Sequence, residues 1–129
     1  MNKEAHYLIR EGVLKKLSLK KNTEEQMYLF LFSDMILFSK KNKKNMKRAS
    51  IYDYRNNISL RNCTAGELDQ SEIALLTSLN PNIPFNLCFK VVKESQTQPI
   101  YMILQASSIL DKKRWLNDLQ VALKLINKK

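Results

Sequence analysis

The sequence SILDKKRWLNDLQVALKLINKK, residues 108–129, has the periodicity of one amphipathic helix and decides how the rest of the chain is arranged. Its apolar residues recur at i, i+4, i+7, i+8 and i+11, which is one stripe of an α-helix: Trp115, Leu119, Ala122, Leu123 and Ile126. Ser108 suits an N-cap, and Asp111 places a carboxylate near the first-turn N–H groups. Lys112 and Lys113 fall off the stripe, so we expect them to face solvent. Such a helix after a series of strands must cover a sheet or close a barrel.

Upstream of this helix the pattern is that of strands. Apolar alternation and dense apolar runs predict strands at residues 12–19, 27–32, 35–39, 50–54, 57–60, 85–92 and 100–106. Ser33-Asp34 is a turn signal, so residues 27–39 are expected to form a hairpin. Residues 50–54 and 57–60 are interpreted as one strand with a break or a bulge at Arg55-Asn56.

Residues 61–84 have the least regular pattern and are interpreted as a long insertion between strands. Asp69 and Glu72 form a capping pattern, which predicts a short helix over residues 69–79. Pro81 and Pro84 end it. The expected fold class is therefore mainly β, a partly open barrel of about seven antiparallel strands capped by the C-terminal helix.

Composition limits the function classes. The 129 residues suit one domain, and the formal net charge of +10 implies an anionic partner: a membrane surface, a nucleic acid or an acidic protein face. Cys63 and Cys88 are expected to be reduced thiols. One histidine, His6, and two cysteines are too few for a zinc site of recognisable spacing, and two glycines cannot form a phosphate-cradling loop. We expect no enzyme, no metal and no cofactor.

Two segments carry a family resemblance: REGVLKKLS at residues 10–18 and YLFLFSDMILFS at residues 28–39. Together with Trp115 in a C-terminal helix, they resemble a pleckstrin homology (PH) domain. The form is similar to PH domains that follow the Dbl-homology (DH) domain of Rho-family guanine nucleotide exchange factors. The resemblance implies a lead-in from a preceding domain at residues 1–10 and a PH domain at residues 11–129. It also implies a binding module whose partners include a DH domain and a Rho-family GTPase, any exchange activity lying outside this chain.

PH domains that hold phosphoinositides tightly resemble one another in three basic positions. Lys16 matches the first, near the end of the first strand. The other two fall at Gln26 and Tyr28, which carry no charge. Neither residue gives the charge-assisted bonds to phosphate that a guanidinium or an ammonium gives. The resemblance therefore implies weak headgroup selectivity, and Lys15, alternate to Lys16 on the strand, is expected to face the other way.

Basic residues nevertheless gather around two predicted loops, after the first strand and at residues 40–48. The resemblance places both loops at one open rim of the barrel, and each lysine near an anionic leaflet contributes about 1 kcal/mol, weakened by salt. The candidate lipid-binding residues are Lys15, Lys16, Lys20, Lys21, Lys40, Lys41, Lys43, Lys44, Lys47 and Arg48.

Alternatives remain open for this charge. The run at residues 40–48 also fits a solvated loop, or a contact with an acidic protein. Nucleic-acid binding is not expected, because the aromatic residues are segregated from the basic ones along the chain. Two functions follow: a cytoplasmic, monomeric module that is peripheral at anionic membranes, phosphoinositides among the lipids, or a protein-interaction module that packs on the exchange domain or its GTPase.

Overall fold

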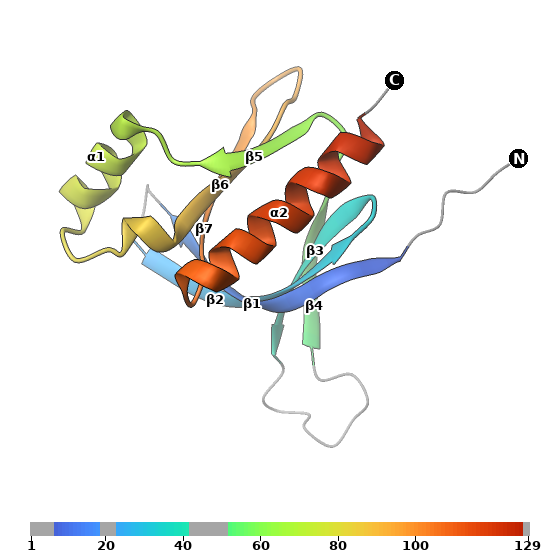
Figure 1. The fold of residues 1–129 in the computed structure, drawn as a ribbon, viewed down its shortest axis with the longest axis horizontal. Coiled ribbons are helices and arrows are strands. Elements are labelled where there is room, and N and C mark those ends of the chain that lie inside the picture. Colours follow the sequence, from blue (N-terminus) through green and yellow to red (C-terminus); the bar gives the residue numbers. More distant parts are fainter. Residues whose placement is uncertain (1–6, 19–22, 42–51, 128–129) are drawn as a thin grey trace, which may run out of the picture.

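A computed structural model describes residues 7–18, 23–41 and 52–127. Seven antiparallel strands form one sheet in the order β4-β3-β2-β1-β7-β6-β5 (Figure 1). The strands are β1 (Leu8–Ser18), β2 (Thr23–Phe32), β3 (Met35–Lys41), β4 (Tyr52–Ser59), β5 (Cys63–Glu67), β6 (Cys88–Lys93) and β7 (Ile100–Gln105). The helices are α1 (Gln70–Leu79), the short 3-10 helix η1 (Phe85–Leu87) and α2 (Ile109–Ile126). The expected fold class, a mainly β barrel with a C-terminal helix, is confirmed.

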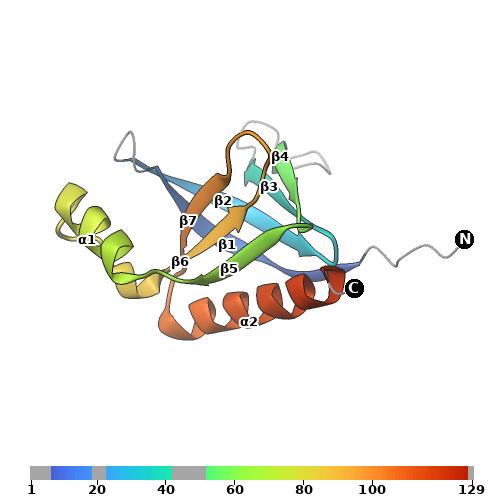
Figure 2. The ribbon, with the colours of Figure 1, turned by 90° about the horizontal axis from the view of Figure 1, so that it is seen from above.

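Helix α2 lies along one side of the strongly curved sheet and closes it (Figure 2). The Ser108 side chain accepts a hydrogen bond from the backbone N–H of Asp111 at 3.0 Å, which confirms the predicted N-cap. Trp115, Leu119 and Ala122 are at most 2% exposed and pack in the main core cluster, as their spacing predicted.

The prediction for Lys112 was wrong. This lysine is only 8% exposed, because its ammonium bonds the Glu67 carboxylate at 2.6 Å and the Asn86 carbonyl at 3.0 Å. A buried charge persists when it is paired and hydrogen-bonded, and both partners come from segments distant in the sequence.

The β2–β3 hairpin forms as expected and joins Tyr28–Leu31 to residues 36–39. On β2 the buried residues Met27, Leu29 and Leu31 alternate with partly exposed ones, so one face lines the core and the other lies outside. The register of β1 against β2 pairs Leu14 with Met27 inside the barrel and Val13 with Tyr28 outside. These two pairs determine which residues face inward along both strands, as far as the register shift between Leu8 and Arg10.

Several predicted boundaries differ from the structure. Strand β1 begins at Leu8, four residues before the predicted start, and Leu8 pairs with Phe32. Strand β4 is continuous, and the ladder passes from Asn56 to Tyr54 opposite Phe38 and Ser39, so the extra residue is the predicted bulge. The division into residues 1–10 and 11–129 stays a prediction.

The segment predicted as an insertion contains the seventh strand. β5 pairs with β6 from Cys63–Lys93 to Glu67–Phe89 and forms one edge of the sheet. Residues 85–87 form η1 instead of continuing β6, because Pro84 precedes them and the Leu87 N–H bonds the Pro84 carbonyl at 2.9 Å. Phe85 is therefore 41% exposed and not inside the barrel.

Helix α1 confirms the predicted capping box. The Asp69 side chain accepts from the Glu72 N–H at 2.9 Å, and the Glu72 carboxylate accepts from the Asp69 N–H at 2.7 Å. The same carboxylate accepts two bonds of 3.0 Å from Lys90 on β6 and one from the Tyr101 hydroxyl on β7. These bonds fasten the first turn of α1 to the outer face of the sheet.

Both cysteines are buried free thiols, as predicted. Burial raises the pKa of Cys88 to about 11 and also raises the pKa of Cys63, so both stay protonated at neutral pH. None of the described helices combines the length and the hydrophobicity that crossing a bilayer requires.

Candidate functional site

The candidate site lies where β1 and β3 end, on the side of the barrel away from α2 (Figure 2). Strand β1 reaches this edge with Lys15 to Ser18, β2 leaves it at Thr23, and β3 reaches it with Lys40 and Lys41. We give the name rim to the candidate basic residues of the segments 15–21 and 40–48, of which the structure describes the side chains of Lys15, Lys16 and Lys40 at this edge. The three neighbouring strands bring Lys16 and Lys40 together although they are far apart in the sequence.

Lys16 lies on the inner side of β1. It is two residues beyond the buried Leu14, and its ammonium is 5.9 Å from the ring centroid of the buried Phe38. Residues two apart on a strand share a face, so the Lys16 side chain extends over the open end of the core. Its charge therefore lies at the mouth of the barrel.

Glu25 lies opposite Lys16 in the β1–β2 ladder and forms an ion pair with Lys40. The Lys40 ammonium is 3.1 Å from the Glu25 carboxylate, and the two side chains are 39% and 50% exposed. Two cations and one anion thus meet at the mouth. An anionic ligand that reaches Lys40 must compete with Glu25, which the sequence analysis did not consider.

Lys15 faces the other way, as predicted. It pairs with Gln26, shares the outer face of the sheet with Tyr28, and lies 3.6 Å from the Glu24 carboxylate. The Tyr28 hydroxyl donates to Glu11 at 3.0 Å on this outer face. The three positions aligned with the basic signature therefore do not share a face: Gln26 and Tyr28 belong with Lys15, whereas Lys16 points inward.

A hollow lies on the outer face of the sheet, which is the face that carries Lys15. A pocket of about 360 Å³ separates the C-terminal half of α1 from the β1–β2 edge, and Leu76, Leu79, Lys15 and Glu24 are among its lining residues. Lys15 is the one described cation that lines this pocket, and its ammonium already lies next to the Glu24 carboxylate. The pocket therefore offers an anion less positive charge than the mouth of the barrel does.

The remaining candidates cannot be placed. The side chain of Lys41 lies outside the described side chains, and its backbone pairs with Tyr52. Six further candidates lie outside the described residues: Lys20, Lys21, Lys43, Lys44, Lys47 and Arg48. Glu24 and Glu25 are the residues that sequence reasoning missed, and their position directly after the first loop was the available signal.

Residues 3–122 match the family model of the SOS1/NGEF-like PH domain. The chain belongs to this family of PH domains. A PH domain is a binding module and not a catalytic one, so its function depends on what its surfaces contact.

Curated relatives of this PH domain are Rho guanine nucleotide exchange factors. The mouse FERM, ARHGEF and pleckstrin domain-containing protein 2 is 31% identical over 115 residues, covering 89% of the chain and 9% of the relative. The human Rho guanine nucleotide exchange factor 26 is 22% identical over 104 residues, covering 78% of the chain and 12% of the relative. The chain thus spans about a tenth of the length of these relatives.

Solved structures of the same fold include DH/PH fragments and a single PH domain. The DH/PH domains of PDZ-RhoGEF, in complex with activated RhoA, align with a TM-score of 0.67 at 17% identity, over 93% of this chain and 30% of that one. The Slm1 PH domain, whose structure shows ligand binding in a non-canonical site, also gives 0.67 at 15% identity, over 89% of this chain and 96% of that one. At these identities the likeness shows the fold alone.

Proposed function

We propose that this PH domain brings a Rho guanine nucleotide exchange factor to anionic membranes through the rim. The observation that carries the proposal is the meeting of Lys16 and Lys40 at the mouth of the barrel, on strands that precede in the sequence the segments with most of the other rim lysines. Lysines near an anionic leaflet add about 1 kcal/mol each, so four or five acting together support micromolar binding.

Weak headgroup selectivity is part of the proposal. Gln26 and Tyr28 supply no charge and lie on the face opposite to Lys16, while Glu25 faces the mouth. A selective phosphate pocket needs several cationic donors directed at one point. The rim instead offers charge spread over flexible lysine side chains, so phosphoinositides bind as anionic lipids among others. The module acts as a monomer in the cytoplasm, peripheral at membranes.

Charge reversal tests the proposal. Changing Lys40, Lys41, Lys43 and Lys44 to Glu is expected to abolish co-sedimentation with anionic vesicles while the unfolding transition stays close to that of the wild type. The matched control reverses four exposed basic residues remote from the mouth of the barrel: Arg61, Lys113, Arg114 and Lys124. Because both variants change net charge equally, vesicle binding that survives rim reversal, or that is lost equally in the control, would contradict the rim assignment.

A second candidate function is a protein contact, with the exchange domain or its bound GTPase in the parent protein. Exposed apolar side chains favour it: Tyr7, Val121 and Leu125 are 50%, 52% and 62% exposed at the end of the barrel remote from the rim. Exposed apolar groups gathered in one place indicate an interaction surface. The two functions are compatible because they use opposite ends of the molecule.

A further inference from the structure

The connection between β6 and β7, residues 94–99, has the sequence ESQTQP and lies at the same end of the sheet as the mouth of the barrel. Strand β7 is antiparallel to β1 and pairs Leu104 with Lys16 and Ile103 with Leu17. From Ile103 back to its first residue, Ile100, β7 extends about 10 Å further in the direction in which β1 ends. The β6–β7 connection therefore begins beyond the level of Lys16.

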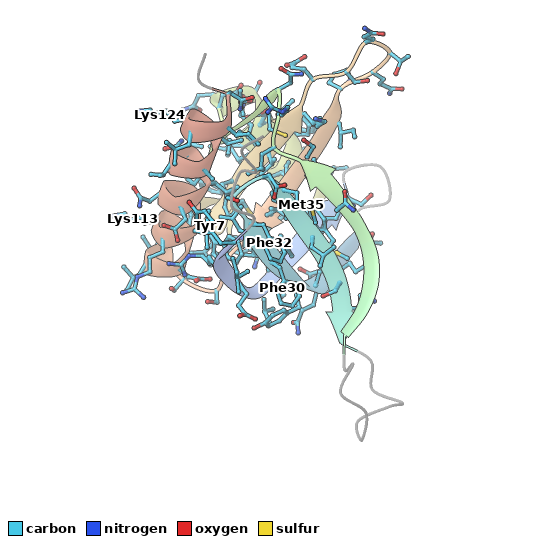
Figure 3. All side chains as sticks on the ribbon, turned by 90° about the vertical axis from the view of Figure 1, so that its right-hand side faces the viewer. Tyr7, Phe30, Phe32, Met35, Lys113 and Lys124 are labelled. Atoms are coloured by element: carbon cyan, nitrogen blue, oxygen red, sulfur yellow. The ribbon has the colours of Figure 1, made fainter. Side chains whose placement is uncertain are left out.

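Two views place this connection relative to α2. Figure 2 shows it on the side of the molecule away from α2, which is the side on which β1 and β3 also end. In Figure 3 the connection extends clear of the strands, whereas Lys113 and Lys124 lie on α2 at the other side of the molecule. A flat membrane that lies against the ends of β1 and β3 therefore also faces the β6–β7 connection.

The β6–β7 connection differs in charge from the rim. All of its residues are exposed, and Glu94 is the one charged residue among them. The candidate lipid-binding residues of the rim, in contrast, are all cationic. A group that added negative charge to the connection would thus place an anion on the side of the molecule that the rim makes attractive to anionic lipids.

Two exposed hydroxyl groups in this connection do not hold the fold together. The hydroxyl oxygens of Ser95 and Thr97 are 3.4 Å apart, and the Thr97 N–H donates to Ser95 Oγ at 3.4 Å. Their described hydrogen bonds thus stay within the connection, whereas the hydroxyl of Ser108 caps α2. The base of the hairpin is fixed by the pairing of β6 with β7 and by a bond of 2.9 Å from the Glu94 N–H to the Asn62 carbonyl. Either hydroxyl can therefore be modified without loss of a structural bond to the rest of the domain.

A phosphoryl group at either hydroxyl would oppose membrane binding. Phosphoserine and phosphothreonine carry about −1.5 to −2 charges at neutral pH. One such group offsets the attraction of about one or two lysines near an anionic leaflet. Because the Debye length at physiological salt is about 8 Å, only a phosphate that faces the leaflet has this effect. The position of the β6–β7 connection meets that condition.

We propose that Ser95 and Thr97 are phosphorylation sites that regulate the rim, and that the phosphorylated connection releases the domain from anionic membranes. A protein kinase transfers the γ-phosphoryl group of ATP to the hydroxyl oxygen: the new O–P bond forms, the bond to ADP breaks, and the hydroxyl proton is released. Hydrolysis by a phosphatase restores the hydroxyl. This inference rests on the proposed function and names its regulation, an electrostatic switch.

Vesicle co-sedimentation of the full 129-residue chain tests the effect of charge at this position. The double variant Ser95→Glu, Thr97→Glu is expected to bind phosphatidylcholine vesicles that contain phosphatidylserine about tenfold more weakly than the wild type at low salt. Its unfolding transition should stay close to that of the wild type. Lys113→Glu is the matched control, because it changes the net charge by the same two units on α2. Its binding should stay within about twofold of the wild type, since α2 lies far outside the Debye length.

Mass spectrometry tests the modification itself. After incubation of the wild-type chain with ATP and a cytosolic extract, phosphate is expected on Ser95 or Thr97. On sedimentation with the same vesicles, the phosphorylated chain should be enriched in the supernatant and the unmodified chain in the pellet, and a phosphatase should abolish the difference.

Three results would each overturn the inference: no phosphate on either residue, equal sedimentation of the phosphorylated and unmodified chains, or an equal loss of binding in Lys113→Glu. Failure of the unmodified wild-type chain to bind vesicles would overturn the proposed function, and this inference with it. The unmodified chain thus separates the two kinds of failure.

Discussion

Glu25 faces Lys16 across the β1–β2 ladder and holds the ammonium of Lys40 at 3.1 Å. An ion pair between side chains this exposed adds little to folding, at most about 1 kcal/mol. The ion pair matters more for anion binding than for folding, because it occupies one of the two described cations at the mouth of the barrel. At the scale of the residue, the structure thus shows an internal competitor for anionic ligands.

Neutralising that competitor is expected to strengthen lipid binding. Glu25→Gln removes the negative charge beside Lys16 and Lys40, so binding to phosphatidylserine vesicles at low salt should rise about threefold to fivefold, the equivalent of about 1 kcal/mol. Vesicle co-sedimentation measures the change. Glu24→Gln is the matched control, because it alters net charge equally but frees Lys15 on the outer face. Equal gains in both variants, or no gain at Glu25, would show that the mouth has no special role.

At the scale of the element, local periodicity predicted α2 and the β2–β3 hairpin because each has a strong pattern and its own end signals. Strand β5 was missed since it is five residues long, lies at a sheet edge, and carries Gly66 and Glu67 in place of an apolar run. The position of Lys112 depended on Glu67 and Asn86, partners that no local window contains.

The sequence predicted which charges gather at the site, but not how the side chains are arranged there. The clustering of lysines around two loops is visible in the chain, and alternation alone separates Lys15 from Lys16. The opposite directions of Lys16 and Tyr28 required the β1–β2 register, which is a long-range property. The hollow beside the C-terminal half of α2 is lined by the start of β1, the β2–β3 turn and the end of α2, so no single stretch of sequence indicates it.

Helix α1 is expected to depend on pH through Glu72. Burial by itself raises the pKa of this carboxyl, but hydrogen bonds from Tyr101, the Asp69 N–H and Lys90 outweigh burial and hold the pKa below its usual 4.5. A carboxyl with a lowered folded-state pKa stabilises the fold above its unfolded-state pKa, and this stability is lost as pH falls through the folded value. Hydrogen exchange of the α1 amides should therefore quicken as pH falls below about 4.5, beyond the intrinsic pH trend.

Glu72→Gln provides the comparison. It should lower the free energy of unfolding by about 1 to 3 kcal/mol at neutral pH, because the bonds to Lys90 and Tyr101 lose their charge. The difference from the wild type should shrink as the pH falls through the lowered pKa of the Glu72 carboxyl, because the wild-type group is then neutral as well. Denaturant unfolding at a series of pH values measures this, with Glu94→Gln in the exposed β6–β7 connection as the control. A difference independent of pH would assign Glu72 a packing role only.

At the scale of the whole molecule, the strands β1 to β3 separate two surfaces of different chemistry. One end carries lysines over the open core, and the other carries a hollow beside α2 that is lined by both apolar and polar side chains. The net charge of +10 attracts the domain to anionic surfaces at distances up to about the Debye length of 8 to 10 Å at physiological salt.

The central claim is that charge, and not headgroup shape, governs membrane binding at the rim. The most direct measurement is co-sedimentation of the wild-type chain with vesicles that carry mono-, bis- or trisphosphorylated inositol lipids or phosphatidylserine, adjusted to equal surface charge, at low and at physiological salt. We expect equal binding at equal charge and a marked loss of binding as salt rises. A clear preference for one headgroup at equal charge would contradict the claim, since it would require a formed phosphate pocket despite Gln26, Tyr28 and Glu25.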